Sequence, residues 1–178
     1  MAAPLPNIEE ARDNATFEAL MWALSRPGVE RRLPEPGLAP VVRALVDLEV
    51  TAFTDDEGLR PLIDRTGARP ACPTTADYLF LSGGAEEAFR QARTGSAIHP
   101  EAGATLVLAA PLRAGGRVRL AGPGIDGSIT ISPALSPELW GIRAERVTYP
   151  LGFDLFIVDG DRVIGLPRST HITHIEVL

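Results

Sequence analysis

Arg168 is the clearest candidate for a ligand-binding residue in this sequence, because it lies in Pro167-Arg-Ser-Thr170 directly after a predicted strand. An arginine guanidinium presents a planar fork of N–H donors that matches two oxygens of a phosphate or phosphonate. The hydroxyl of Thr170 adds a further donor. The segment therefore predicts a site for a small anion. The alternative is that Arg168 forms an ordinary surface salt bridge.

A second group of candidate ligand-binding residues lies in the polar segment 94–105, which leads into an apolar run. Loops at the ends of strands often carry functional residues. This segment contains Thr94, Gly95, His99 and Glu101, and the glycines on both sides of the glutamate would let its backbone approach a ligand closely. The alternative is a loop that only orders the entry to the next strand.

Three residues that can bind metals occur near the C-terminus, His171, His174 and Glu176. On a strand, His174 and Glu176 share one face and His171 lies on the other. A helix would bring the histidines together, but the β-branched residues between them disfavour one. We therefore predict a polar strand and no metal site, with a metal-dependent enzyme that uses these three residues as an alternative.

The segment Gly122-Pro-Gly-Ile-Asp-Gly127 matches the glycine pattern of a dinucleotide-binding loop. Such a loop needs a helix directly after it, so that the N-terminal amides of the helix hold the pyrophosphate. Here residues 128–131 alternate between polar and apolar types like a strand, and Pro123 removes one amide N–H from the loop. The pattern indicates a tight β-turn.

The composition excludes several classes of chemistry. The chain has 178 residues, and all 17 of its basic residues are arginine. Without lysine, no side-chain amine can form the Schiff base that anchors pyridoxal phosphate, and there is no P-loop lysine to bind a nucleoside triphosphate. The formal net charge is −6, so a nucleic-acid partner is not expected. Cys72 is the only cysteine, so no intrachain disulfide can form.

The sequence also bears on where the protein acts. Residues 1–7 have neither the basic region nor the apolar region of a signal peptide. The apolar runs are about half as long as the roughly 20 residues that cross a bilayer. We expect a cytoplasmic protein that has no contact with a membrane.

The elements that would position the candidate residues alternate between helices and strands in the first half of the chain, whereas strand pairs dominate later. Helices are expected over residues 8–25, 40–49, 59–66, 85–92 and 138–146, and strands over residues 51–54, 77–81, 104–110, 117–121, 128–131, 153–158, 162–166 and 172–177. This pattern predicts an α/β fold in which one mixed sheet is flanked by helices, in a single domain over residues 1–178.

The helix expected at the N-terminus has the clearest boundaries. Asn7 and Glu10 have the spacing of a capping box, and a proline and a glycine follow Arg26. The spacing of Phe17, Leu20, Met21 and Leu24 predicts that these four residues form its buried face.

Five segments in chain order resemble the PhnH family, over a region that runs from about residue 8 to the end. The segments are Phe17-Glu-Ala-Leu-Met-Trp-Ala-Leu-Ser-Arg-Pro-Gly28, Thr94-Gly-Ser-Ala-Ile-His-Pro-Glu-Ala-Gly-Ala-Thr105, Leu120-Ala-Gly-Pro-Gly-Ile125, Pro150-Leu-Gly-Phe-Asp-Leu155 and Leu166-Pro-Arg-Ser-Thr170. Each segment is a weak signal alone, and the five in order are specific.

The resemblance implies a subunit of the bacterial carbon–phosphorus lyase system. In that system ATP and an alkylphosphonate yield a ribose 1-phosphonate 5-triphosphate and free adenine. It further implies a homodimer that works with the sister subunits PhnG, PhnI, PhnJ and PhnL. The implied fold is like the large domain of pyridoxal-phosphate-dependent transferases without that cofactor. Arg168, Thr170, Thr94, Gly95 and Glu101 match the family's motifs, and no catalytic role comes with the match.

Two other functions stay open from the sequence. One is a self-sufficient transferase that binds ATP and phosphonate itself, for which Glu101 and His99 are the residues of the right type for acid–base work. The other is a small-anion-binding domain without catalysis.

Overall fold

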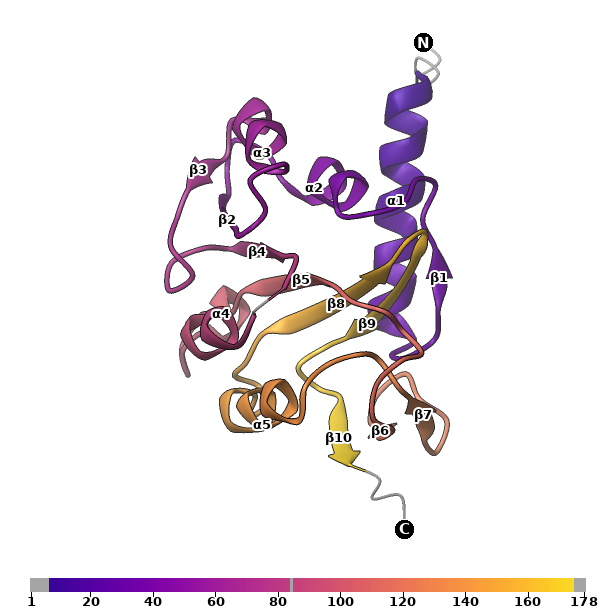
Figure 1. Cartoon of the computed structure of the whole chain (residues 1–178). Helices are drawn as coiled ribbons and strands as arrows, with labels where there is room; N and C mark the ends of the chain where they lie inside the picture. The colour runs from indigo at the N-terminus through magenta and orange to yellow at the C-terminus, as the bar shows by residue number, and fades with distance from the viewer. Residues whose placement is uncertain (1–6, 84, 175–178) are drawn as a thin grey trace.

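The computed structural model describes residues 7–83 and 85–174, which form a mixed α/β fold (Figure 1). The helices are α1 (Ile8–Ser25), α2 (Ala39–Leu45), α3 (Arg60–Thr66), α4 (Glu86–Gln91) and α5 (Pro137–Arg146), with a short 3-10 helix at Pro100–Ala102. The strands are β1 (Arg31–Arg32), β2 (Thr51–Thr54), β3 (Arg69–Pro70), β4 (Tyr78–Leu81), β5 (Thr105–Ala109), β6 (Val118–Ala121), β7 (Ile129–Ile131), β8 (Asp154–Asp159), β9 (Arg162–Leu166) and β10 (His171–His174).

The main sheet has seven strands in the order β1-β9-β8-β5-β4-β2-β3. Neighbouring strands from β3 to β8 are parallel, whereas β9 is antiparallel to both of its neighbours, β8 and β1. The central strands β4, β5 and β8 are almost entirely buried. Helices cover both faces of a parallel sheet, and this explains why these strands are continuous apolar runs in the sequence.

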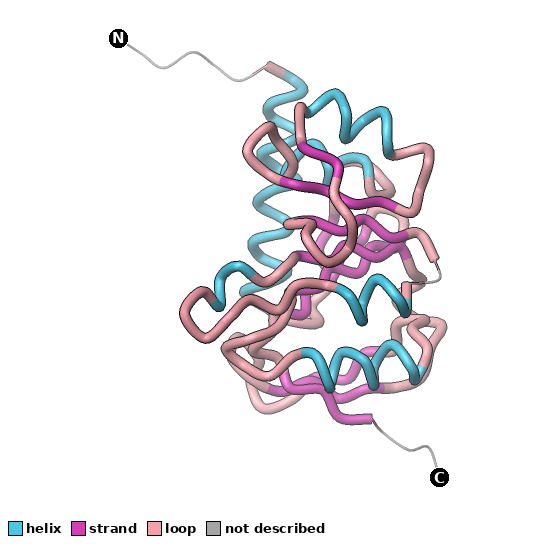
Figure 2. Tube along the Cα trace, turned by 90° about the vertical axis from the view of Figure 1, so that its left-hand side faces the viewer, coloured by secondary structure: helices cyan, strands magenta, loops and turns pink. Residues whose placement is uncertain are grey.

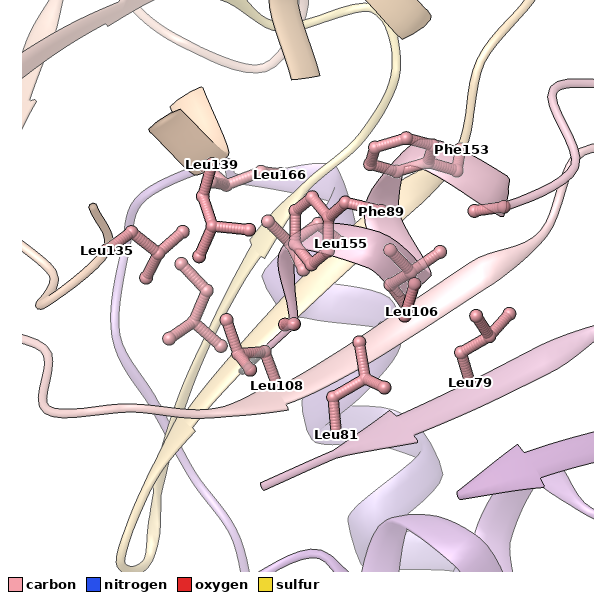
Figure 3. Packing of buried hydrophobic residues seen from close by; sticks show 14 of the residues in the cluster. Leu79, Leu81, Phe89, Leu106, Leu108, Leu135, Leu139, Phe153, Leu155 and Leu166 are labelled. Atoms are coloured by element: carbon pink, nitrogen blue, oxygen red, sulfur yellow. The ribbon is translucent and has the colours of Figure 1, made fainter. Parts of the chain in front are cut away.

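The main sheet lies between two groups of helices, α1 to α3 on one face and α4 and α5 on the other (Figures 1 and 2). A small antiparallel sheet, β10-β6-β7, lies on the same side as α5. The larger of the two apolar cores joins α4, α5 and the small sheet to the main sheet, and Figure 3 shows its leucines and phenylalanines. Phe89 of α4 meets Phe153 edge to face, with ring centroids 5.4 Å apart.

Helix α1 confirms the predicted ends and corrects the predicted buried face. Asn7 and Glu10 form both bonds of the capping box, each 2.9 Å long. The buried residues of α1 are Thr16, Ala19, Leu20 and Ala23. Phe17 and Met21 are about half exposed, so the prediction that they face the core is wrong. Small residues on the buried side let α1 pack closely against β9 and α2, whereas the large side chains of Phe17, Met21 and Trp22 lie outside.

The other predicted elements recur with small shifts, except for the helix expected over residues 40–49, which ends at Leu45. Residues 122–127 form the loop between β6 and β7, as predicted for a turn. The last strand is described from His171 to His174, and the rest of the expected strand lies outside the described residues. The sequence did not indicate β1, β3 or the separate small sheet. In the described part of the chain, no helix is both long and apolar enough to cross a bilayer.

Candidate anion-binding site

The candidate residues meet where β5 and β8 begin and β9 ends. Because β8 and β9 are antiparallel partners, with Leu155 opposite Leu166, the segment 167–170 lies beside Asp154 at the start of β8. Because β5 and β8 are parallel, with Thr105 opposite Asp154, the loop before β5 reaches the same place. The sheet therefore brings together two segments that are far apart in the sequence.

Arg168 connects these segments through its guanidinium. Its Nη2 lies 2.7 Å from Oδ2 of Asp154 and its Nε lies 3.2 Å from Oδ1, which makes a two-point ion pair. Its Nη1 donates to the carbonyl of Pro100 over 2.6 Å. Both side chains of the pair are largely buried, with 15% and 21% of their surface exposed. The positive charge of Arg168 is thus compensated inside the protein.

The loop that contains Thr94 and Gly95 is closed on itself. Thr94 pairs with Gly103 in an antiparallel bridge, and the carbonyl of Thr94 accepts the N–H of Gly152 over 2.9 Å. Gly95 has φ +74°, and a side chain there would start 2.7 Å from the carbonyl oxygen of Pro100. The structure thus places Thr94 and Gly95 where they shape the loop around Arg168.

His99 and Glu101 form a pair on the outside of this loop. Nδ1 of His99 lies 3.0 Å from Oε1 of Glu101, and both side chains are about 70% exposed. The pKa of Glu101 is lowered by a hydrogen bond from its own backbone N–H and by the bond to His99. Acid–base groups work best in protected positions, and here water surrounds both residues.

A cavity of about 220 Å³ lies beside Arg168, under helix α5. Two residues of the predicted anion site, Arg168 and Thr170, line it. The complete lining is Trp140, Arg143, Ala144, Val147, Tyr149, Arg168, Thr170, His171 and Ile172. None of these described lining residues is a carboxylate, so the charged groups of the wall are basic.

Arg143 is a lining residue that the sequence analysis missed. Only 4% of its surface is exposed, and it comes from the buried side of α5. Its Nη2 donates to the carbonyl of Pro167 over 3.0 Å and its Nη1 to that of Thr170 over 3.4 Å. Within the described residues no acceptor faces its Nε. Burial lowers the pKa of Arg143 to about 10, against the opposing effect of Asp154.

Thr170 is also buried, with 3% of its surface exposed. Its backbone N–H donates to the carbonyl of Pro167 over 2.9 Å, which closes a turn. Its hydroxyl has no hydrogen-bond partner in residues 7–83 and 85–174. Buried hydroxyls are normally satisfied, so this one is an exception among the described residues.

A sequence signal for Arg143 did exist. It follows Leu139 by four residues and Trp140 by three, and residues at these spacings share a helix face. Leu139 and Trp140 are both buried, so a charged residue on their face is an exception to the helical pattern. Such exceptions often mark functional positions.

The remaining candidates concern the C-terminal strand. His171 lines the cavity and its side chain is exposed, whereas Glu176 lies outside the described residues. No cluster of three or more His, Cys, Asp or Glu that could hold a metal ion occurs among the residues that the structure describes.

Comparison with known proteins assigns this chain to a family. The family model for PhnH, described as a bacterial phosphonate metabolism protein, matches residues 8–173. The chain belongs to the PhnH family. The match includes every residue that lines the cavity and the whole loop from Thr94 to Gly103.

Two relatives illustrate the relationship. A protein of Stutzerimonas stutzeri named as a C-P lyase subunit, HtxG, is 33% identical over 168 residues, which cover 90% of this chain and 86% of the relative. The alpha-D-ribose 1-methylphosphonate 5-triphosphate synthase subunit PhnH of Rhizobium meliloti is 28% identical over 179 residues, which cover 89% and 88%. The likeness therefore extends over nearly the whole of each chain.

Proposed function

We propose that this protein is a subunit of a carbon–phosphorus lyase system in phosphonate catabolism. It would serve the step that converts ATP and an alkylphosphonate into alpha-D-ribose 1-methylphosphonate 5-triphosphate and adenine. The observation that carries this proposal is the PhnH match over residues 8–173. Two relatives whose names place them in this system support it.

The subunit is proposed to be needed for the reaction without catalysing it alone. Glu101 and His99, the residues that a self-sufficient transferase would use, are exposed to water on the outside of their loop. ATP and phosphonate are accordingly substrates of the assembly, and no cofactor is bound covalently. The proposed fold is like the large domain of the pyridoxal-phosphate-dependent transferases, and the absence of lysine supports only that their cofactor is not anchored covalently.

The proposed partners are a second copy of the chain and the sister subunits PhnG, PhnI, PhnJ and PhnL, in the cytoplasm. Helix α1 supports the homodimer, because Phe17, Met21 and Trp22 each have about half of their surface exposed. Large apolar side chains gathered on one helix are typical of a surface that another protein covers. Nucleic acid is not among the proposed partners, since the net charge is −6. A membrane is not proposed either, because the apolar runs are too short to cross a bilayer.

The test is phosphorus NMR of ATP with methylphosphonate, first with this chain alone and then with the sister subunits. We expect a ribose-linked phosphonate signal only in the complete mixture, and we expect that signal to disappear when this chain is omitted. A signal from the chain alone would show a self-sufficient transferase. If the sister subunits gave the same ribose-linked phosphonate signal when this chain is omitted, the proposal would be disproved.

A further inference from the structure

We propose that the cavity under α5 binds a tetrahedral oxyanion of the phosphoryl or phosphonyl type, with Arg143 as the charged anchor and the Thr170 hydroxyl as a second donor. The anion-binding role of the cavity is inferred from the residues around it. Only the choice of a phosphonate as the ligand rests on the proposed function. The role of Arg168 is then to hold the wall of this site through Asp154.

The charges around the cavity support an anionic ligand. Two guanidinium groups, Arg143 and Arg168, share a single carboxylate, that of Asp154, which forms its two-point pair with Arg168. Arg143 has no ion pair of its own within the described residues. A buried charge without a partner is costly in a medium of low dielectric constant. An anion in the cavity would compensate it.

The positive charge of this site is local, because the chain as a whole carries a net charge of −6. The protein as a whole would therefore repel an anion, so affinity must come from contacts made in the cavity itself. His171 lines the cavity as well and is exposed to solvent. It stands where an entering ligand would meet it.

The hydrogen-bonding groups point to the same ligand. A guanidinium has five N–H groups, and those of Arg143 make two bonds to backbone carbonyls, one of them long at 3.4 Å. Thr170 lines the same cavity, and its buried hydroxyl lacks a partner in the described chain. A phosphoryl or phosphonyl group offers several acceptor oxygens on one centre, so it can accept from both residues.

The volume of the cavity fits a small ligand. A cavity of about 220 Å³ has room for roughly seven water molecules, at about 30 Å³ for each. That space accommodates a phosphate or a methylphosphonate. The exposed Tyr149 and the buried Trp140 supply apolar surface on the same wall, where the methyl group of a phosphonate could pack.

A purely structural role would explain Arg143 alone, because its bonds to Pro167 and Thr170 hold the turn before β10. It would not explain Thr170, whose hydroxyl is buried without a bond. Thr170→Val keeps the shape of the side chain and removes that hydroxyl. Because the hydroxyl makes no bond within the described residues, Thr170→Val should fold at least as stably as the natural protein. The variant therefore separates ligand binding from folding.

The experiment is a calorimetric titration of the full chain with inorganic phosphate, methylphosphonate and ATP in separate runs. We expect saturable binding of phosphate and methylphosphonate. Thr170→Val is expected to weaken that binding by about threefold to tenfold without lowering the melting temperature, and Arg143→Met by at least about tenfold. Arg69→Met, which removes an exposed arginine of β3, is the matched control and should bind like the natural protein.

Two results would overturn the inference. One is the absence of saturable phosphate and methylphosphonate binding, with or without binding of ATP. The other is phosphate and methylphosphonate binding that Thr170→Val leaves unchanged. This second result can be read even if Arg143→Met fails to fold. The titration needs no sister subunit, so it can fail while the NMR assay of the complete mixture succeeds, and the reverse is equally observable.

Discussion

Arg168 and Asp154 form a two-point ion pair at the start of β8, with Nη2–Oδ2 at 2.7 Å and Nε–Oδ1 at 3.2 Å. The backbone N–H of Arg168 donates to the same Oδ1 over 2.8 Å. The pair therefore joins the end of β9 to the start of β8 and, through Pro100, to the loop before β5. The sequence suggests Arg168 as a ligand-binding arginine, and the fold gives its guanidinium a partner within the protein, the carboxylate of Asp154.

Removing the carboxylate of this pair should destabilise the fold. Asp154→Asn leaves a largely buried guanidinium without its charged partner, and we expect a loss of roughly 1.5–3 kcal/mol of unfolding free energy in urea denaturation. Asp161→Asn is the control, because Asp161 pairs with Arg32, whose side chain is 83% exposed, and exposed pairs contribute little. Equal losses in the two variants would contradict this assignment.

Two glycines should respond to alanine in opposite ways. A methyl group on Gly103 would lie 2.1 Å from the carbonyl oxygen of Gly152 and 2.7 Å from Nη1 of Arg168, so Gly103→Ala should cost about 1–3 kcal/mol of stability. Gly141 lies in α5 with open space around it, so Gly141→Ala should add about 0.5–1 kcal/mol through helix propensity. Thermal unfolding of both variants checks the pair, and a stable Gly103→Ala would show that the loop yields easily.

The proposed homodimer predicts a change of mass on substitution in α1. Met21→Glu places a charge among the exposed apolar residues of that helix and should convert a particle of twice the 19.0 kDa chain mass into a monomer. Light scattering after gel filtration measures this. Leu48→Glu, at a residue that is 71% exposed and outside α1, should leave the mass unchanged. A natural protein that is already monomeric would refute the proposal.

The thiol of Cys72 should react at an unusually low pH. Hydrogen bonds with the hydroxyls of Thr74, at 2.9 Å, and of Thr75, at 3.3 Å, lower its pKa to about 7. The thiolate is the reactive form, so the rate of alkylation by iodoacetamide should be half-maximal near pH 7 and fall as the pH drops below it.

The variant that tests this cause is Thr74→Val, which removes the stronger of the two hydrogen bonds. It should move the midpoint of the alkylation profile toward the ordinary value for cysteine, about 8.5. Thr130→Val, at an exposed position of β7, is the control and should leave the profile in place. A midpoint that Thr74→Val does not shift would rule out the Thr74 hydroxyl as the cause.

The sequence by itself determined the elements whose signals are local. The capping box at Asn7, the strand Thr51–Thr54 and the hairpin of β8 and β9 lie where their residues predict, because caps, alternation and turns act over a few residues. The family was likewise readable from five short segments, and the match over residues 8–173 confirms it.

The tertiary structure decided which faces are buried and which polar groups meet. Phe17 and Met21 have the spacing of a buried face, yet close packing against β9 and α2 selects Ala19 and Ala23 instead. The ends of short strands are also set by pairing partners that are distant in the sequence, which explains why the two-residue β1 could not be predicted.

The same reason explains the site. The sequence indicated Arg168 and Thr170 as anion ligands, but it could not show that Asp154 compensates the charge of Arg168. Nor could it show that α5 carries Arg143 to the same cavity. Electrostatic compensation depends on distances across the sheet and between layers. Those distances follow from strand order and helix packing, which no local pattern of residues contains.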